Sequence, residues 1–91
     1  MGFEYDSNKS DLNKLKHGID FEEAQALWED PYAFELPSHQ KLKEDRFLIL
    51  GKIKSKHYTA IITYRDANTR IVSVRRSRKE EVKLYERIRN R

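Results

Sequence analysis

The stretch RFLILGKI, residues 46–53, is the most informative part of this 91-residue chain, because four large apolar residues follow one another in it. Such a run is typical of a strand that is buried on both faces of a sheet. Two more strand patterns follow, at 58–65 and 70–76, and polar turns separate them. Another strand is expected at 32–36, where Pro37 ends it. Four strands bunched in this way predict an antiparallel β-meander.

Helical patterns lie before and after the predicted meander. A short strand is expected at 3–5. Asp6 or Ser7 can then cap a helix that is expected to run to about Lys16. We expect its leucines, Leu12 and Leu15, to lie on the buried side of this helix.

A second helix is predicted from Asp20 to Asp30. Asp20 and Glu23 have the spacing of a capping box, and the proline after Asp30 ends helical geometry. The residues expected to face the core share helical spacing: Phe21, Ala24, Leu27 and Trp28. After the last strand, Ser77 and Glu80 form a second capping pattern and predict a C-terminal helix. The fold class is therefore α+β, with two N-terminal helices, the meander and one C-terminal helix.

The charge is distributed unevenly. Nineteen Lys and Arg against fifteen Asp and Glu give a net charge of +4 and a pI near 9.4. Residues 75–91 carry +5 and the remainder carries −1, whereas residues 20–36 hold six acids and no Lys or Arg. A polyanion is therefore expected to bind near the C-terminal segment. The same run is also explained by an ordinary solvated helix face, and both interpretations stay open at this point.

Several function classes find no support in the sequence. The chain has no cysteine, its three histidines lack metal-ligand spacing, and its three glycines are too far apart for a phosphate loop. We therefore expect neither a metal nor a cofactor. No apolar run approaches the roughly 20 residues of a membrane span, and the N-terminus lacks a signal-peptide pattern. A cytoplasmic protein is expected.

The residues best suited to chemistry are cations on the predicted meander. Alternation along the last strand places Ser73 and Arg75 on one face together with Ile71. Arginine matches the geometry of phosphate, and RNA supplies its own nucleophile, the 2′-hydroxyl. A nuclease can therefore work with a base, a charge stabiliser and an acid. Simpler roles are also open: Arg65 flanks a predicted hairpin turn, and His17 stands where a helix C-terminus favours a cation. The residue types alone predict a basic domain that binds RNA or an acidic partner.

Several motifs resemble those of the BrnT family. They are NKLKHGIDFEEA at 13–24, WEDP at 28–31, DRF at 45–47, YR at 64–65 and RIVSVRRS at 70–77. The resemblance spans nearly the whole chain and implies a single BrnT-like toxin domain over 1–91. It also implies a RelE-like fold and a metal-independent ribonuclease that acts as the toxin of a type II toxin–antitoxin module. RNA cleavage would proceed through attack by the 2′-hydroxyl.

The resemblance also implies a site and a partner. The matching residues are Lys16, His17, Arg46, Arg65, Arg75, Arg76 and Tyr85, and the charge pattern adds Lys79. We expect Arg65 and Arg75 to hold the scissile phosphate. Arg46 or Arg76 would position the RNA backbone, and His17 or Tyr85 would transfer a proton. The implied partner is a BrnA-like, DNA-binding antitoxin. The toxin would contact operator DNA only through this antitoxin. The alternative is a non-catalytic module that binds nucleic acid or a partner protein.

Overall fold

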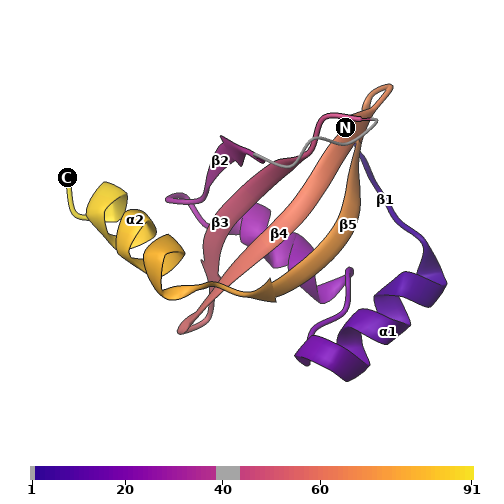
Figure 1. The fold of residues 1–91 in the computed structure, drawn as a ribbon, viewed down its shortest axis with the longest axis horizontal. Helices are drawn as coiled ribbons and strands as arrows, with labels where there is room; N and C mark the ends of the chain where they lie inside the picture. The colour runs from indigo at the N-terminus through magenta and orange to yellow at the C-terminus, as the bar shows by residue number, and fades with distance from the viewer. Residues whose placement is uncertain (1, 39–43) are drawn as a thin grey trace.

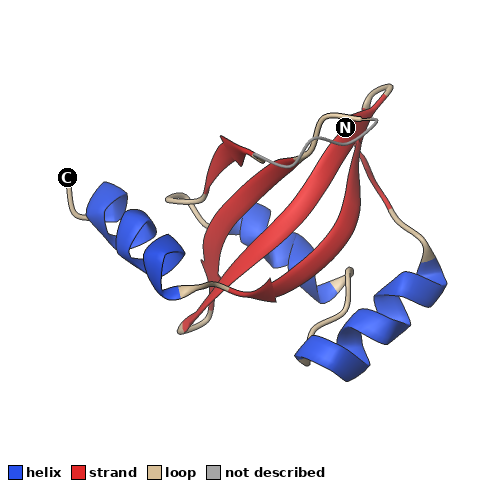
Figure 2. Cartoon of the chain, viewed as in Figure 1, coloured by secondary structure: helices blue, strands red, loops and turns tan. Residues whose placement is uncertain are grey.

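The computed structural model of the chain describes residues 2–38 and 44–91, which form a five-stranded sheet and three helices (Figures 1 and 2). In chain order the elements are β1 (Gly2–Glu4), α1 (Ser7–His17), the 3-10 helix η1 (Glu23–Glu29), β2 (Phe34–Pro37), β3 (Phe47–Ile53), β4 (Lys56–Arg65), β5 (Asn68–Arg76) and α2 (Lys79–Arg89). This order confirms the predicted α+β class. Most of the loop expected before β3 falls on residues 39–43, outside the described residues.

The sheet has the strand order β1-β5-β4-β3-β2. Strands β2 to β5 pair antiparallel with their neighbours in sequence, which confirms the meander. The expectation of a purely antiparallel sheet is wrong, because β1 pairs parallel with β5, Gly2 opposite Asn68 and Glu4 opposite Arg70. Parallel neighbours need a long connection between them, and here α1, η1 and three strands supply it. No local pattern in the first residues could reveal a partner so distant in sequence.

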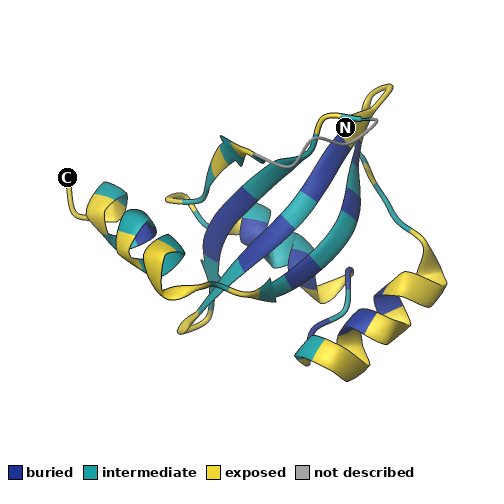
Figure 3. Cartoon of the chain, in the orientation of Figure 1, coloured by how far each residue is buried: buried dark blue, intermediate teal, exposed yellow. Residues whose placement is uncertain are grey.

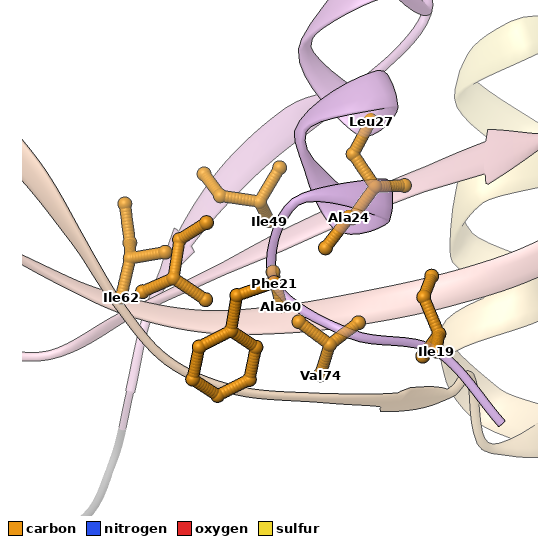
Figure 4. Packing of buried hydrophobic residues seen from close by; sticks show 9 residues of the cluster. Ile19, Phe21, Ala24, Leu27, Ile49, Ala60, Ile62 and Val74 are labelled. Atoms are coloured by element: carbon orange, nitrogen blue, oxygen red, sulfur yellow. The ribbon is translucent and has the colours of Figure 1, made fainter. Parts of the chain in front are cut away.

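The core lies between one face of the sheet and the segment that contains η1 (Figure 4). Asp20 and Glu23 bind each other's backbone at the start of this segment: Glu23 N donates to Asp20 Oδ1 at 2.7 Å, and Asp20 N donates to Glu23 Oε1 at 3.0 Å. The predicted capping pair is therefore confirmed. The helix ends at Asp30, whose backbone is extended. Its apolar side chains pack with those of the central strands; the buried cluster is Ile19, Phe21, Ala24, Leu27, Ile49, Ala60, Ile62, Ile71 and Val74.

Helix α1 packs through polar side chains. Asp6 caps it, accepting from the backbone N–H of Asn8 at 2.8 Å, and Gly18 ends it in the left-handed conformation at φ 76°. The expectation that its leucines are buried is wrong: Leu12 is 63% exposed and Leu15 is 84% exposed. Ser10 and Asn13 are buried instead. Figure 3 shows that most of α1 is exposed.

The physical reason for this inversion is the open edge of β5. Because β1 pairs only with the first residues of β5, the later part of that strand lacks a neighbouring strand on this side. The side chain of Asn13 supplies the missing bonds. Its Nδ2 donates to Val74 O at 2.9 Å, and its Oδ1 accepts from Val74 N at 3.2 Å. Nδ2 also donates to Ile19 O at 2.7 Å. The hydrogen bonds of this buried amide thus fix α1 with a polar side facing the sheet.

Helix α2 follows β5 and contacts β3. Its capping pair is one residue later than predicted: Arg78 is the N-cap, and Arg78 N donates to Glu81 Oε1 at 2.7 Å. Ser77 instead forms hydrogen bonds with β4. Its backbone N donates to His57 O at 3.0 Å, and its hydroxyl bonds with that of Thr59 at 2.8 Å. The N-terminus of α2 is thereby fixed beside the end of β5.

Candidate functional site

A cavity of about 440 Å³ opens on the face of the sheet opposite the core. Alternation along the strands creates this face, since Ile49 and Ile62 point into the core while their neighbours Leu48 and Ile61 line the cavity. The start of α2 forms one side of it. The lining residues are Ser38, Arg46, Leu48, Ile61, Val72, Ser73, Arg75, Arg78 and Glu81. Three arginines from three parts of the chain therefore surround a surface of apolar side chains, and we call this the arginine cavity.

A bulge in β5 shapes the cavity. Ile61 pairs with Ser73, but the next residue of β4, Ile62, pairs with Ile71, so Val72 is an extra residue. Bulges redirect side chains and are common beside functional sites. Here both Val72 and Ser73 line the cavity, while Ile71 is in the core. The expectation that Ile71 shares a face with Ser73 and Arg75 is therefore wrong, because strict alternation breaks at the bulge.

Arg75 is held by a carboxylate. Its Nη1 lies 2.7 Å from Oε1 of Glu81 and its Nη2 lies 2.9 Å from Oε2, a bidentate pair in which both side chains are at least four-fifths buried. Thr59 Oγ1 also donates to Glu81, at 3.0 Å. Burial alone would raise the pKa of Glu81, but the hydrogen bonds from Arg75 and from the backbone of Arg78 outweigh it, so the pKa lies below its ordinary value. Glu81 is ionised at neutral pH.

Arg46 is the second guanidinium of the cavity. Among the described residues, its Nε is a buried nitrogen that has no hydrogen-bond partner. Buried polar atoms are nearly always paired in proteins. With Arg46, Arg75 and Arg78 against the single carboxylate of Glu81, the charge of the lining is positive. The cavity is suited to an anion that brings hydrogen-bond acceptors.

A family model described as "Ribonuclease toxin, BrnT, of type II toxin-antitoxin system" matches residues 5–81. The chain belongs to the BrnT family. A search of curated proteins finds no match. BrnT members are ribonuclease toxins, so RNA is the substrate of the family and a protein antitoxin is its partner. The matched range contains every residue that lines the arginine cavity, including Glu81, and ends before most of α2.

The structure places Arg65 far from the cavity of this BrnT protein. Arg65 pairs with Asn68 at the turn between β4 and β5, whereas Arg75 stands seven residues further along β5 and pairs with Thr59. Six residues of β4 separate Arg65 from Thr59, the partner of Arg75, so at about 3.4 Å per residue the two arginines are roughly 20 Å apart. The expectation that both hold one phosphate is therefore corrected. Arg65 instead lies 3.4 Å from Glu44, and both side chains are well exposed.

Tyr85 is part of the fold of α2 and does not line the arginine cavity. The residue is 2% exposed, and its hydroxyl donates to Asp30 Oδ2 at 2.7 Å. Burial and this bond raise the pKa of Tyr85 well above its ordinary value. Its neighbour His57 binds Glu86 at 2.7 Å. Tyr85 also lies outside the family match, so neither geometry nor the match supports its expected role in proton transfer.

The remaining predicted cations form a second group near the end of β5. The bonds between Asn13 and Val74 place the last turn of α1, with Lys16 and His17, along this end of the strand. Arg76 lies over the ring of Tyr58, 5.6 Å from its centroid. Tyr58 faces the core side of the sheet, so Arg76 is on the other side from the cavity. Lys79 begins α2, one residue after Arg78, and is exposed.

Sequence reasoning missed Arg78 and Glu81. Arg78 belongs to the basic run 75–91, but nothing in that run distinguishes it from its neighbours. Glu81 follows Arg75 by six residues, and the two meet only because the chain leaves β5 and begins α2 between them. The feature that could have identified Glu81 is its position three residues after Arg78, the N-cap of α2.

A second cavity, of about 500 Å³, lies beside the turn that follows η1, and its lining includes two carboxylates, Glu29 and Asp30, and three cations, Lys52, Lys54 and Arg89. Its net positive charge is therefore smaller than that of the cavity lined by Arg46, Arg75 and Arg78. Within residues 2–38 and 44–91, no three His, Asp or Glu side chains are grouped as metal ligands would be. No helix of that part of the chain has the length and apolar character needed to cross a membrane.

Proposed function

We propose that this BrnT protein is a metal-independent endoribonuclease toxin and that the arginine cavity binds the phosphate at which RNA is cut. The observation that carries the proposal is the buried Nε of Arg46, which has no partner among the described residues, in a cavity that Arg75 and Arg78 also line. A phosphate oxygen would supply the missing acceptor. Guanidinium groups bind phosphate with two parallel hydrogen bonds, which gives both charge and orientation.

In the proposed reaction the RNA 2′-oxygen attacks the adjacent phosphorus. A bond forms between the 2′-oxygen and phosphorus, and the bond from phosphorus to the 5′-oxygen of the next nucleotide breaks. The products are a 2′,3′-cyclic phosphate and a 5′-hydroxyl. Arg46 and Arg75 stabilise the negative charge that grows on the phosphate oxygens. Fixed donors of this kind commonly contribute a factor of about 100 to 1000 in rate.

Two protons must move in this reaction. The 2′-hydroxyl loses one, and the 5′-oxygen gains one from water. The carboxylate of Glu81 lines the cavity and is ionised, so we propose it as the acceptor of the first proton. Lys16, His17 and Arg76 would bind the RNA backbone beyond the cut, because they lie around the end of β5 rather than in the cavity. Lys79 would bind it beside Arg78.

The proposal is tested with purified protein and a labelled RNA in buffer that contains EDTA. We expect fragments that end in a 2′,3′-cyclic phosphate. Arg46→Lys keeps the charge but loses the planar fork, and we expect it to slow cleavage at least 10-fold. Arg87→Ala is the matched control, since this exposed arginine of α2 is outside the cavity. RNA that stays intact but shifts on a gel would contradict the proposal and favour the binding module.

The wider expectations from the family resemblance are proposed with this activity. They are a RelE-like arrangement of one toxin domain over residues 1–91, a cytoplasmic location, and a BrnA-like antitoxin that carries the complex to operator DNA. Membership of a type II toxin–antitoxin family supports a protein partner. A gel-shift assay tests the last expectation: operator DNA should shift with the complex and remain free with the toxin alone.

A further inference from the structure

Helix α1 presents its apolar side chains to solvent. Leu12 and Leu15, one turn apart, are 63% and 84% exposed, while the residues that face the protein are Ser10 and Asn13. In a helix of a soluble protein the apolar side normally packs on the core. Here the bonds of Asn13 to β5, together with that of Ser10 Oγ to Phe21 N at 2.9 Å, fix the opposite orientation. The exposed leucines therefore result from specific contacts.

The charges around the leucines indicate what kind of partner fits. At 100° per residue, Lys9 and Lys16 lie on the same side of α1 as Leu12, and both lysines are exposed. Asp11 is the one carboxylate of this helix, whereas Lys14 on its other side is already paired with Glu23 at 2.7 Å. Two lysines and one carboxylate, Asp11, therefore border the leucines, and the net charge of this face is positive. A helix with apolar side chains flanked by Asp or Glu would complement this face.

We propose that the exposed side of α1, formed by Lys9, Leu12, Leu15 and Lys16, is the docking surface for an acidic amphipathic helix of the protein antitoxin. The inference rests on the proposed function, because it names the partner that controls this toxin. Leucines one turn apart are the usual anchors when one helix packs on another. A second copy of this chain is a poorer occupant, since both surfaces would carry the same net positive charge and each chain is +4 overall.

The leucines of this surface lie apart from the residues proposed to cut RNA, whereas Lys16 belongs both to this surface and to the cations proposed to bind the RNA backbone. Leu12 and Leu15 do not line the arginine cavity, and they contribute little to the core because they are exposed. A variant of these residues is therefore expected to fold and to cut RNA normally. Lys9 is likewise outside the cavity and outside the second cationic group.

The test uses the full-length toxin and, as probe, the protein encoded by the reading frame adjacent to the toxin gene. Affinity is measured by calorimetry for wild type and for L12Q/L15Q, in which glutamine keeps helix propensity and size. We expect binding to weaken at least 100-fold, as for two central interface anchors, with an unchanged melting temperature and unchanged RNA cleavage. Lys9→Glu should weaken binding up to about 10-fold, more strongly at low salt. Lys56→Glu, at an exposed lysine of β4, is the charge control.

The possible results are distinct. If L12Q/L15Q binds the probe within 3-fold of wild type, or if wild type does not bind it, the docking proposal is overturned. A wild-type dimer in light scattering that L12Q/L15Q abolishes would show that a second copy occupies the surface, which also overturns it. If wild type binds the probe through the leucines but leaves RNA intact, the docking proposal stands and the proposed ribonuclease activity fails.

Discussion

Removing Arg75 should lower stability as well as slow cleavage, and the pair with Glu81 determines how large the loss of stability is. Arg75→Ala leaves a carboxylate that is about 85% buried with only Thr59 and the backbone of Arg78 as donors. Hydrogen bonds to charged groups contribute about 1.5–3 kcal/mol, and partial solvent exposure places this pair near the lower value. We expect Arg75→Ala to lower the free energy of unfolding by about 1.5–2 kcal/mol.

A double-mutant cycle measures the interaction itself. Arg75→Ala, Glu81→Ala and the double variant are unfolded in urea and followed by circular dichroism. Because the double variant leaves neither charge unpaired, its loss of stability should be smaller than the sum of the two single losses by about 1 kcal/mol or more. For a domain of this size, about 1.5 kcal/mol also corresponds to a fall in melting temperature of roughly 6–12 °C. A coupling energy below about 0.3 kcal/mol would refute the reasoning.

The same pair predicts a dependence of stability on pH. The pKa of Glu81 is lower in the folded chain than its ordinary value of 4.5. Its contribution to stability is therefore complete above about pH 4.5 and is lost as the pH falls through the lowered pKa of the folded state. In Arg75→Ala the pKa of Glu81 returns toward its ordinary value, so stability should fall less steeply in acid. Equal slopes for wild type and variant would contradict this explanation.

Three further substitutions test the fold around the site. Asn13→Ala should lower the free energy of unfolding, measured in urea, by about 2–3 kcal/mol. The reason is that it leaves several buried backbone groups of β5 and of the segment before η1 without partners. A loss below 0.5 kcal/mol would mean that water replaces the amide. Gly51→Ala should lower it by about 1–2 kcal/mol, since a Cβ there would lie 2.9 Å from Cδ2 of Leu27; a calorimetric melting temperature equal to that of wild type would show that the core adapts. Tyr85→Phe should cost about 1 kcal/mol by removing the hydrogen bond to Asp30, and a more stable variant in the same urea assay would argue against that bond.

Features that depend on neighbouring residues could be predicted from the sequence. The apolar run of β3 required burial on both faces, and Leu50 and Ile49 are indeed buried on opposite faces. The capping pair of Asp20 and Glu23 could be predicted because both partners lie within four residues of each other. Asp30 ended its helix as expected, since the restriction that proline places on the preceding residue is local.

Features that depend on distant residues could not be predicted. The orientation of α1 is set by bonds between Asn13 and Val74, which are 61 residues apart, and no pattern within the helix reveals them. The bulge at Val72 depends on how β5 pairs with β4, so alternation alone assigned Ile71 to the wrong face. Arg65 and Arg75 both carry the chemistry of a phosphate site, but only the strand register shows that they stand at opposite ends of a hairpin.

The parts of the arginine cavity are made at different times during protein synthesis. Arg46 stands just before β3, whereas Arg75 is the next-to-last residue of β5 and Arg78 precedes α2, so two of the three arginines are made well after the first. Since chains emerge from the ribosome N-terminus first, an unfinished toxin holds no complete cavity. Under the proposed function, a nascent copy would spare the message that encodes it until synthesis has passed Arg78.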